Sequence, residues 1–129
     1  PGVRVVWRIH GTTDENVWYV GTNNGASYSH DGARTWNRIS EFQLGHYAVW
    51  SIVVDPRDPM HVYVQTPYHL FESFDGGVTL EMILWGYTQL KYTMLDPVDP
   101  DVLWLVGYSQ LWRYEPPRRR TGPRDARGR

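Results

Sequence analysis

The sequence predicts an all-β fold, and three observations lead to that prediction. The chain of 129 residues is 15% aromatic, with seven Trp and nine Tyr, and aromatic residues are enriched in strands. Gly and Pro recur between short apolar runs, where they indicate turns. No segment keeps apolar residues at a 3.6-residue period for long enough to predict a helix. At this length the chain is expected to form one ordinary domain.

The chain is built from a repeated unit. VWRIHGTTDENVWYVGTNNGASYSHDGARTWNRI (residues 6–39) aligns with VWSIVVDPRDPMHVYVQTPYHLFESFDGGVTLEMI (residues 49–83) and with KYTMLDPVDPDVLWLVGYSQLWRYEPP (residues 91–117). Tyr19 and Tyr63 are 44 residues apart, and Asp55 and Asp96 are 41 apart. Repeats of about 40–45 residues are typical of four-stranded β-propeller blades.

The second unit predicts four short strands over residues 49–54, 61–66, 70–73 and 79–84, separated by Pro, Gly and Asp turns. The third unit ends before its fourth strand, because Tyr114, Glu115 and Pro116 stand where its last turn is expected. The sequence therefore predicts about two and three-quarter four-stranded propeller blades, with units at residues 4–40, 48–84 and 90–115. Propellers close with four to eight blades, so we expect a partial propeller, an oligomerising fragment or an open wedge.

Two turns between the predicted third and fourth strands carry the same motif, SHDGARTW from Ser29 and SFDGGVTL from Ser73. They resemble the Asp-box repeat of bacterial neuraminidases, Ser-x-Asp-x-Gly-x-Thr-Trp, although Ala33 replaces a Gly and Leu80 replaces the Trp. The segment VVDPRDPMHVYVQT is similar to the blades of xyloglucanase-like and sortilin-like propellers, and sialidase-like blades share the box. The resemblance covers about 110 of the 129 residues, within a blade region that we place at residues 1–115. It implies a structural turn on the side of the propeller away from the active-site mouth.

The chemistry of the motif also favours a structural role. The short oxygens of Ser and Asp accept backbone N–H bonds in tight turns, and Gly permits positive φ there. The expected structural residues are Ser29, Asp31, Gly32, Thr35 and Trp36 in the first box, and Ser73, Asp75, Gly76, Gly77 and Thr79 in the second. We expect Trp36 to cover its hairpin and to fill space towards a neighbouring blade.

Successive loops of a propeller alternate between its two ends. The loops at the end opposite the boxes, which we call the mouth, are residues 22–26, 40–48, 66–70, 85–91 and 107–111. Aromatic side chains with polar tips are favoured at recognition surfaces, and these loops are rich in them. The sequence therefore predicts a non-catalytic scaffold that recognises a glycan or peptide, unless these side chains pack between blades. The candidate binding residues are His46, Tyr47, Tyr68, His69, Trp85, Tyr87 and Tyr108.

Two alternatives remain: a fragment of a sialidase-like or xyloglucanase-like glycoside hydrolase, and a protein assembly factor. A glycosidase needs two carboxylates about 5–9.5 Å apart, whereas Glu41 is the only carboxylate in the mouth loops, which also contain no Arg. Oxygen atoms of Asp96, Asp99 and Asp101 could bind Ca²⁺, but Asp-Pro turns explain these residues more simply. His46 and His69 have no third ligand at a metal-site spacing. No cofactor or metal is expected.

The charge is divided unevenly along the chain. Residues 1–115 carry a net charge of −6, and residues 116–129 carry +5. The composition of this basic tail predicts disorder, and nucleic acid is an unlikely partner because only the tail is basic. The expected partners are a glycan, a peptide or protein, or other propeller blades, including those of a second copy. No apolar run reaches the length of a membrane span, the absence of Cys leaves the compartment open, and only the family resemblance points to secretion.

Overall fold

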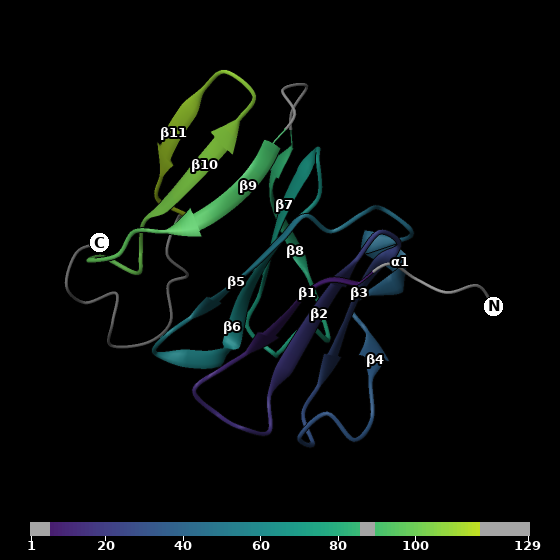
Figure 1. Ribbon diagram of the computed structural model, residues 1–129. Coiled ribbons are helices and arrows are strands. Elements are labelled where there is room, and N and C mark those ends of the chain that lie inside the picture. Colours follow the sequence, from purple (N-terminus) through teal and green to yellow (C-terminus); the bar gives the residue numbers. More distant parts are fainter. Residues whose placement is uncertain (1–5, 86–89, 117–129) are drawn as a thin grey trace.

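The computed structural model describes residues 6–85 and 90–116, which form three antiparallel sheets (Figure 1). Each sheet is a meander in which strands pair in chain order. Blade 1 contains β1 (Val6–Gly11), β2 (Trp18–Thr22), β3 (Gly25–Ser29) and β4 (Asn37–Arg38). Blade 2 contains β5 (Ser51–Asp55), β6 (Asp58–Gln65), β7 (His69–Ser73) and β8 (Glu81–Trp85). Blade 3 contains β9 (Leu90–Leu95), β10 (Leu103–Gly107) and β11 (Leu111–Tyr114).

The predicted fold class is confirmed: two four-stranded sheets and one three-stranded sheet make an all-β, partial propeller. Local boundaries differ from the expected ones. β6 begins three residues early, at Asp58, and β8 begins at Glu81 because Thr79 still belongs to the box turn. A single helical turn, α1 (Glu41–Leu44), occupies part of an expected mouth loop.

The loops alternate between two ends of the molecule, as Figure 1 shows. The β2–β3, β6–β7 and β10–β11 turns lie at the mouth, together with α1. The two box turns and the β1–β2, β5–β6 and β9–β10 loops lie at the opposite end, which we call the box side. This arrangement follows from antiparallel meanders whose strands run between the two ends.

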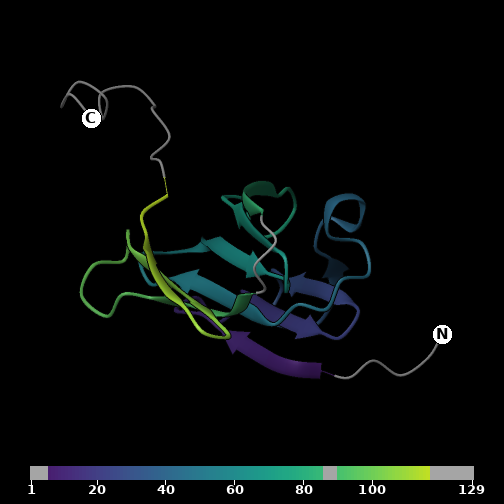
Figure 2. The ribbon, with the colours of Figure 1, turned by 90° about the horizontal axis from the view of Figure 1, so that it is seen from above.

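Blade 2 lies between the other two blades (Figure 2). One buried cluster fills the space between blades 1 and 2, and it includes Tyr19, Ile39, Leu44, Val62, Phe71 and Leu80. A second cluster between blades 2 and 3 contains Tyr63, Leu70, Leu90, Leu103 and Leu105. Since non-directional burial of apolar surface is the main stabilising term in folding, these two interfaces are what hold the sheets together.

Among the described residues, no helix is long and apolar enough to cross a membrane.

Candidate functional site

The two box turns have the same hydrogen bonds. In the second box, the Ser73 hydroxyl donates to Asp75 Oδ1 at 2.8 Å and accepts the Gly77 amide at 2.9 Å. Asp75 Oδ1 accepts the Thr79 amide at 2.9 Å. Ser29, Asp31, Ala33 and Thr35 repeat these bonds in the first box, within 0.1 Å of the same lengths. Each box therefore fastens the backbone between a third and a fourth strand.

The box carboxylates are held in their charged form by these bonds. Hydrogen bonds from the Thr35 side chain and amide and from Ser29 lower the pKa of Asp31 to about 2. Burial opposes ionisation of Asp75, yet bonds from Thr79 and Ser73 lower its pKa below the ordinary value. A carboxylate with a low pKa is a poor general acid or base near neutral pH, so the turn accounts for these residues.

The last position of the box differs between the blades. Leu80 is buried in the cluster between blades 1 and 2, while Trp36 is 39% exposed and belongs to neither described cluster. Leu80 packs towards the blade that precedes it in the chain, and Trp36 has no such blade within the described residues. The expected packing of Trp36 against a neighbouring blade is therefore not seen in this chain.

The second box also contacts the first. His30 Nε2 lies 3.0 Å from the carbonyl oxygen of Gly76. A Cβ added to Gly77 would lie 3.0 Å from Ile39 Cγ1 and 3.2 Å from Tyr28 Cδ2. The tight approach shows that this turn is part of the interface between blades 1 and 2.

Four of the candidate binding aromatics are exposed at the mouth: Tyr47, Tyr68, Trp85 and Tyr108. Tyr87 lies outside the described residues. His69 is partly buried, with its Nδ1 atom 2.9 Å from the Thr66 hydroxyl, and burial lowers its pKa.

The mouth residues divide into separate groups. Tyr47 and Tyr68 both contact His69, with ring centroids 5.0 and 6.5 Å away. His46 is exposed, and its Nδ1 atom lies 2.6 Å from Asn24 Oδ1. The two histidines thus have different partners, and no group of three or more His, Asp or Glu side chains in the described part of the chain is placed to hold a metal ion.

A groove of about 330 Å³ lies between blades 2 and 3. From blade 2 and its mouth turn come Tyr68, Leu84 and Trp85; from blade 3 come Leu90, Leu105, Trp112, Arg113 and Tyr114. The lining is mostly apolar and aromatic, a composition that fits a ligand with apolar groups, and Arg113 borders it.

The sequence predicted Tyr68 and Trp85 as mouth residues, and both line this groove, but it did not predict Trp112, Arg113 or Tyr114 as binding residues. These three residues lie on β11, where the alternation of a propeller strand predicts packing between blades. The departure of Tyr114, Glu115 and Pro116 from the box pattern was the signal for them, because β11 is at the edge of the sheet among the described residues.

Tyr108 does not line this groove. It lines a second hollow, of about 630 Å³. Trp50, Ser51, Lys91, Tyr92, Thr93 and Met94 line it with Tyr108. Lys91 Nζ lies 6.0 Å from the Tyr108 ring centroid, at the limit of a cation–π contact. Of the candidate binding residues, Tyr68 and Trp85 thus line the groove and Tyr108 lines the second hollow.

A polar cluster that the sequence did not reveal lies on the box side of blade 2. His61 Nδ1 is 2.8 Å from Asp55 Oδ2, and His61 Nε2 is 2.7 Å from Glu72 Oε2. The imidazole also stacks on Phe74, with centroids 4.6 Å apart. Burial disfavours the charged imidazole, but the bonds to Glu72 and Asp55 outweigh it and raise the pKa of His61. The imidazole thus bridges the two carboxylates.

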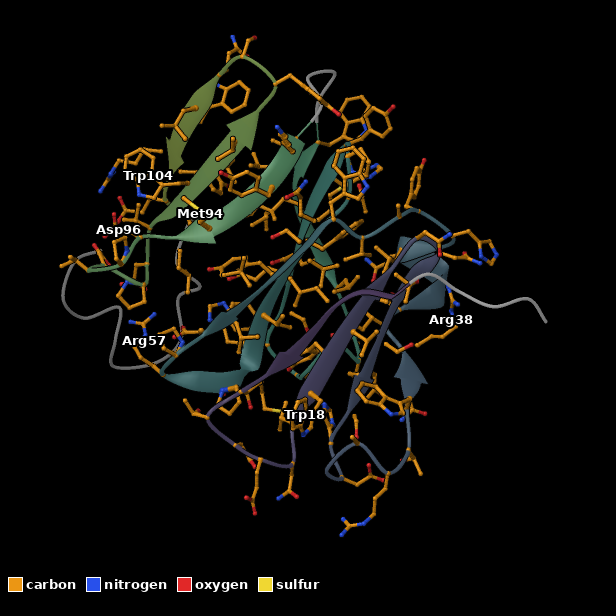
Figure 3. The ribbon with its side chains drawn as sticks, in the orientation of Figure 1. Trp18, Arg38, Arg57, Met94, Asp96 and Trp104 are labelled. Carbon is orange, nitrogen blue, oxygen red and sulfur yellow. The ribbon has the colours of Figure 1, made fainter. Side chains whose placement is uncertain are left out.

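Arg57 connects this cluster to blade 3. Its guanidinium bonds to Asp55 at 3.0 Å and to Asp101 at 2.9 Å. Burial opposes ionisation of Asp55, yet the bonds from Arg57 and His61 lower its pKa to about 2. Figure 3 shows Arg57 on the side of blade 2 that faces the β9–β10 loop, where Asp101 lies.

The remaining Asp residues of the β9–β10 loop are turn residues. Asp96 accepts the amides of Val98 and Asp99 and, at 2.9 Å, the Trp104 indole N–H (Figure 3). The Asp101 amide donates to Asp99. These bonds account for the carboxylates that could otherwise have suggested Ca²⁺.

The fold and these loops define the described chain as adjoining blades of a β-propeller. Known structures similar to it are propellers too: a GH74 xyloglucanase from Xanthomonas campestris (TM-score 0.74, 17% identity, 96% of this chain, 22% of that chain) and a Niastella koreensis GH74 enzyme (0.73, 15%, 88% and 22%). Another is YCF48 bound to D1 peptide (0.67, 14%, 90% and 39%).

The chain spans about a fifth of these GH74 enzymes and about two fifths of YCF48. At such identities the likeness shows the fold alone. No protein-family model matches the sequence, and no curated protein is significantly similar to it.

Proposed function

We propose that this chain is a non-catalytic recognition module of Asp-box blades, which binds a peptide or glycan at its mouth, in the groove between blades 2 and 3. The observation that carries the proposal is the lining of that groove, with Tyr68, Trp85, Trp112 and Tyr114 around one space. Aromatic faces bind apolar side chains and sugar rings alike, and the phenol and indole groups add hydrogen bonds.

The placement of the carboxylates favours binding over hydrolysis. Asp31 and Asp75 hold the box turns, Asp55 and Glu72 bond to His61, and Asp96 caps a loop. Among the described residues, no Asp or Glu lines the groove. A glycosidase mechanism needs a pair of carboxylates at the scissile bond, and the described part of this groove offers none.

The peptide alternative has one further support. YCF48, a similar structure, is bound to a peptide, and we infer by analogy that a propeller surface of this kind can hold an extended chain. The enzyme alternative rests on the likeness to GH74 enzymes, which shows the fold alone.

The test is a peptide and glycan array probed with the full chain, followed by titration calorimetry on any positive ligand. Tyr68→Ala and Trp85→Ala should each weaken binding about tenfold, because losing an aromatic contact costs roughly 1.4 kcal/mol. Trp36→Ala is the matched control, since it removes an exposed Trp from the box side and should leave binding unchanged. Equal affinities for all variants, or ligand hydrolysis, would contradict the proposal.

A further inference from the structure

Among the described residues, blade 3 has one strand fewer than blades 1 and 2. In blades 1 and 2, the third strand pairs with a fourth, β3 with β4 and β7 with β8. In blade 3 the sheet order is β11-β10-β9, so β11 is an edge strand among the described residues. An edge strand is a template for pairing with another chain.

The backbone groups that β11 offers can be deduced from its pairing with β10. The Gly107 amide bonds to the Gln110 carbonyl, so the main-chain groups of Gln110 point towards β10. The direction alternates along an antiparallel strand, and the register Val106↔Leu111 and Trp104↔Arg113 continues without a shift. The N–H and C=O groups of Leu111 and Arg113 therefore point away from β10, to the open edge.

The side chains of β11 alternate as well. Trp112 and Tyr114 line the groove between blades 2 and 3 and pack against the cluster there. Leu111 lies on the other face of the sheet, opposite Val106, and is 62% exposed. A strand added beside β11 would place alternate side chains over the groove and the rest beside Leu111 and Arg113.

We propose that an extended segment of another polypeptide adds to β11 as the fourth strand of blade 3. This inference rests on the proposed function, because the same groove receives the ligand's apolar side chains. The main-chain N–H and C=O groups of Leu111 and Arg113 pair with the added strand. Its sequence is selected by the groove on one face of the sheet and by the Arg113 guanidinium. The ligand is a peptide that alternates aliphatic and acidic residues.

Charge selects an acidic partner over the chain's own basic tail. The Arg113 side chain is more than half exposed, and its contact with Glu115 is long, 3.9 Å. Residues 117–129 carry six Arg and one Asp and no apolar residue larger than Ala, apart from Pro. Such a segment would repel Arg113 and would leave the groove unfilled. A glycan has no main-chain amides to pair with the edge.

The probe is a synthetic acetyl-Glu-Val-Glu-Leu-Glu-Val-Glu-amide peptide, measured by titration calorimetry on the full chain. Its matched controls are the same peptide N-methylated at alternate residues and a version with Lys for Glu. The N-methylated peptide should bind at least tenfold more weakly, because two lost edge bonds at about 1 kcal/mol each exceed the 1.4 kcal/mol of a tenfold change. The Lys peptide should also bind more weakly, and Arg113→Glu should reverse that preference.

Leu111→Pro and Leu111→Ala form the matched pair on the protein. Proline removes one outward N–H and is tolerated where that group is unpaired at an edge, so Leu111→Pro should weaken binding well beyond Leu111→Ala. Amide hydrogen exchange gives an independent measurement: the Leu111 and Arg113 amides should exchange rapidly in the free chain and become protected when the probe is added.

The outcomes separate this inference from the proposed function. If the N-methylated peptide binds as tightly as the unmethylated one while Trp85→Ala still weakens binding, strand addition is overturned. The groove then remains a binding site. No effect of Trp85→Ala on a bound ligand would contradict the proposed function itself. Protection of Leu111 and Arg113 in the free chain, at any concentration, would show an edge already paired by the tail or a second copy and would overturn the proposed partner.

Discussion

Ala33 and Gly77 occupy equivalent positions in the two box turns, and both have positive φ, 69° and 94°. A non-glycine residue in this region costs roughly 1–2 kcal/mol because its Cβ approaches the carbonyl oxygen. Glycine avoids that cost, but its greater conformational freedom in the unfolded chain lowers the free energy of unfolding by about 0.4–1 kcal/mol. The first box therefore has local backbone strain at Ala33, whereas the second box, with Gly77 at the equivalent position, does not.

Replacing Ala33 by Gly should raise the free energy of unfolding by about 0.5–1 kcal/mol. Gly77→Ala should lower it by more, because the added Cβ would also press on Ile39 and Tyr28. Urea unfolding of both variants checks the prediction. A lower midpoint for Ala33→Gly would show that the turn is not strained at this residue.

The His61 cluster makes stability depend on pH in a defined direction. Since the pKa of His61 is raised in the folded state, its contribution is complete below its ordinary pKa near 6.5 and is lost as the pH rises through the raised value. Since the pKa of Asp55 is lowered to about 2, its contribution is present above about pH 4 and is lost as the pH falls towards 2. Tyr63 and Arg57 also face this cluster.

We expect the free energy of unfolding to fall as the pH rises above about 6.5 in the natural chain, and to fall less steeply in His61→Gln. Chemical unfolding at a series of pH values makes the comparison. His46→Gln removes a histidine from the mouth and should keep the natural slope. A slope that is unchanged in His61→Gln would assign the effect to another group.

The box residues could be predicted from the sequence because their hydrogen bonds join residues two to four positions apart. The His61 cluster could not, because its partners are six and eleven positions away, on β5 and β7. Such contacts depend on strand register, which a single sequence specifies only through its turns and apolar pattern.

At the level of elements, Leu80 and Trp36 end equivalent turns but have opposite surroundings. Leu80→Ala should lower the free energy of unfolding by about 2–4 kcal/mol, since it leaves a cavity between two blades. Trp36→Ala should cost less than about 1 kcal/mol, because the indole is 39% exposed. Denaturant unfolding measures both, and a larger loss for Trp36→Ala would contradict the assigned packing.

Strand order and turn positions were predictable because each unit repeats an apolar pattern between Gly, Pro and Asp turns. α1 was not, since Glu41–Leu44 is a single turn and is too short to show a period. The groove was predictable only in part. The alternation of loops placed Tyr68 and Trp85 at one end, but the position of β11 at the edge of the described sheet depends on strand pairing that the loops do not specify.

At the scale of the whole molecule, the partial propeller has an apolar face on blade 3. Cross-strand pairs Met94↔Trp104 and Tyr92↔Val106 lie on the face of the sheet away from the interblade cluster. Tyr92 and Met94 are exposed, and Figure 3 shows Met94 near Trp104. Contiguous apolar surface of this kind favours association.

We expect the chain to self-associate at high concentration, and Met94→Lys to weaken that association severalfold by placing a charge in the apolar face. Light scattering over a concentration series measures it. Val98→Lys is the matched control, because it adds the same charge at an isolated, 88% exposed position of a loop. A natural chain that stays monomeric throughout would contradict the prediction.

Because each strand pairs with strands adjacent to it in the chain, the molecule can fold as a row of small units. Closing the short loops between paired strands costs little chain entropy. Blade 2 shares an interface with each of the other blades, so it should be the last unit to open in hydrogen exchange, while blades 1 and 3 open from the ends. Folding in this order would present a well-formed β11 edge only after blade 2 has become stable.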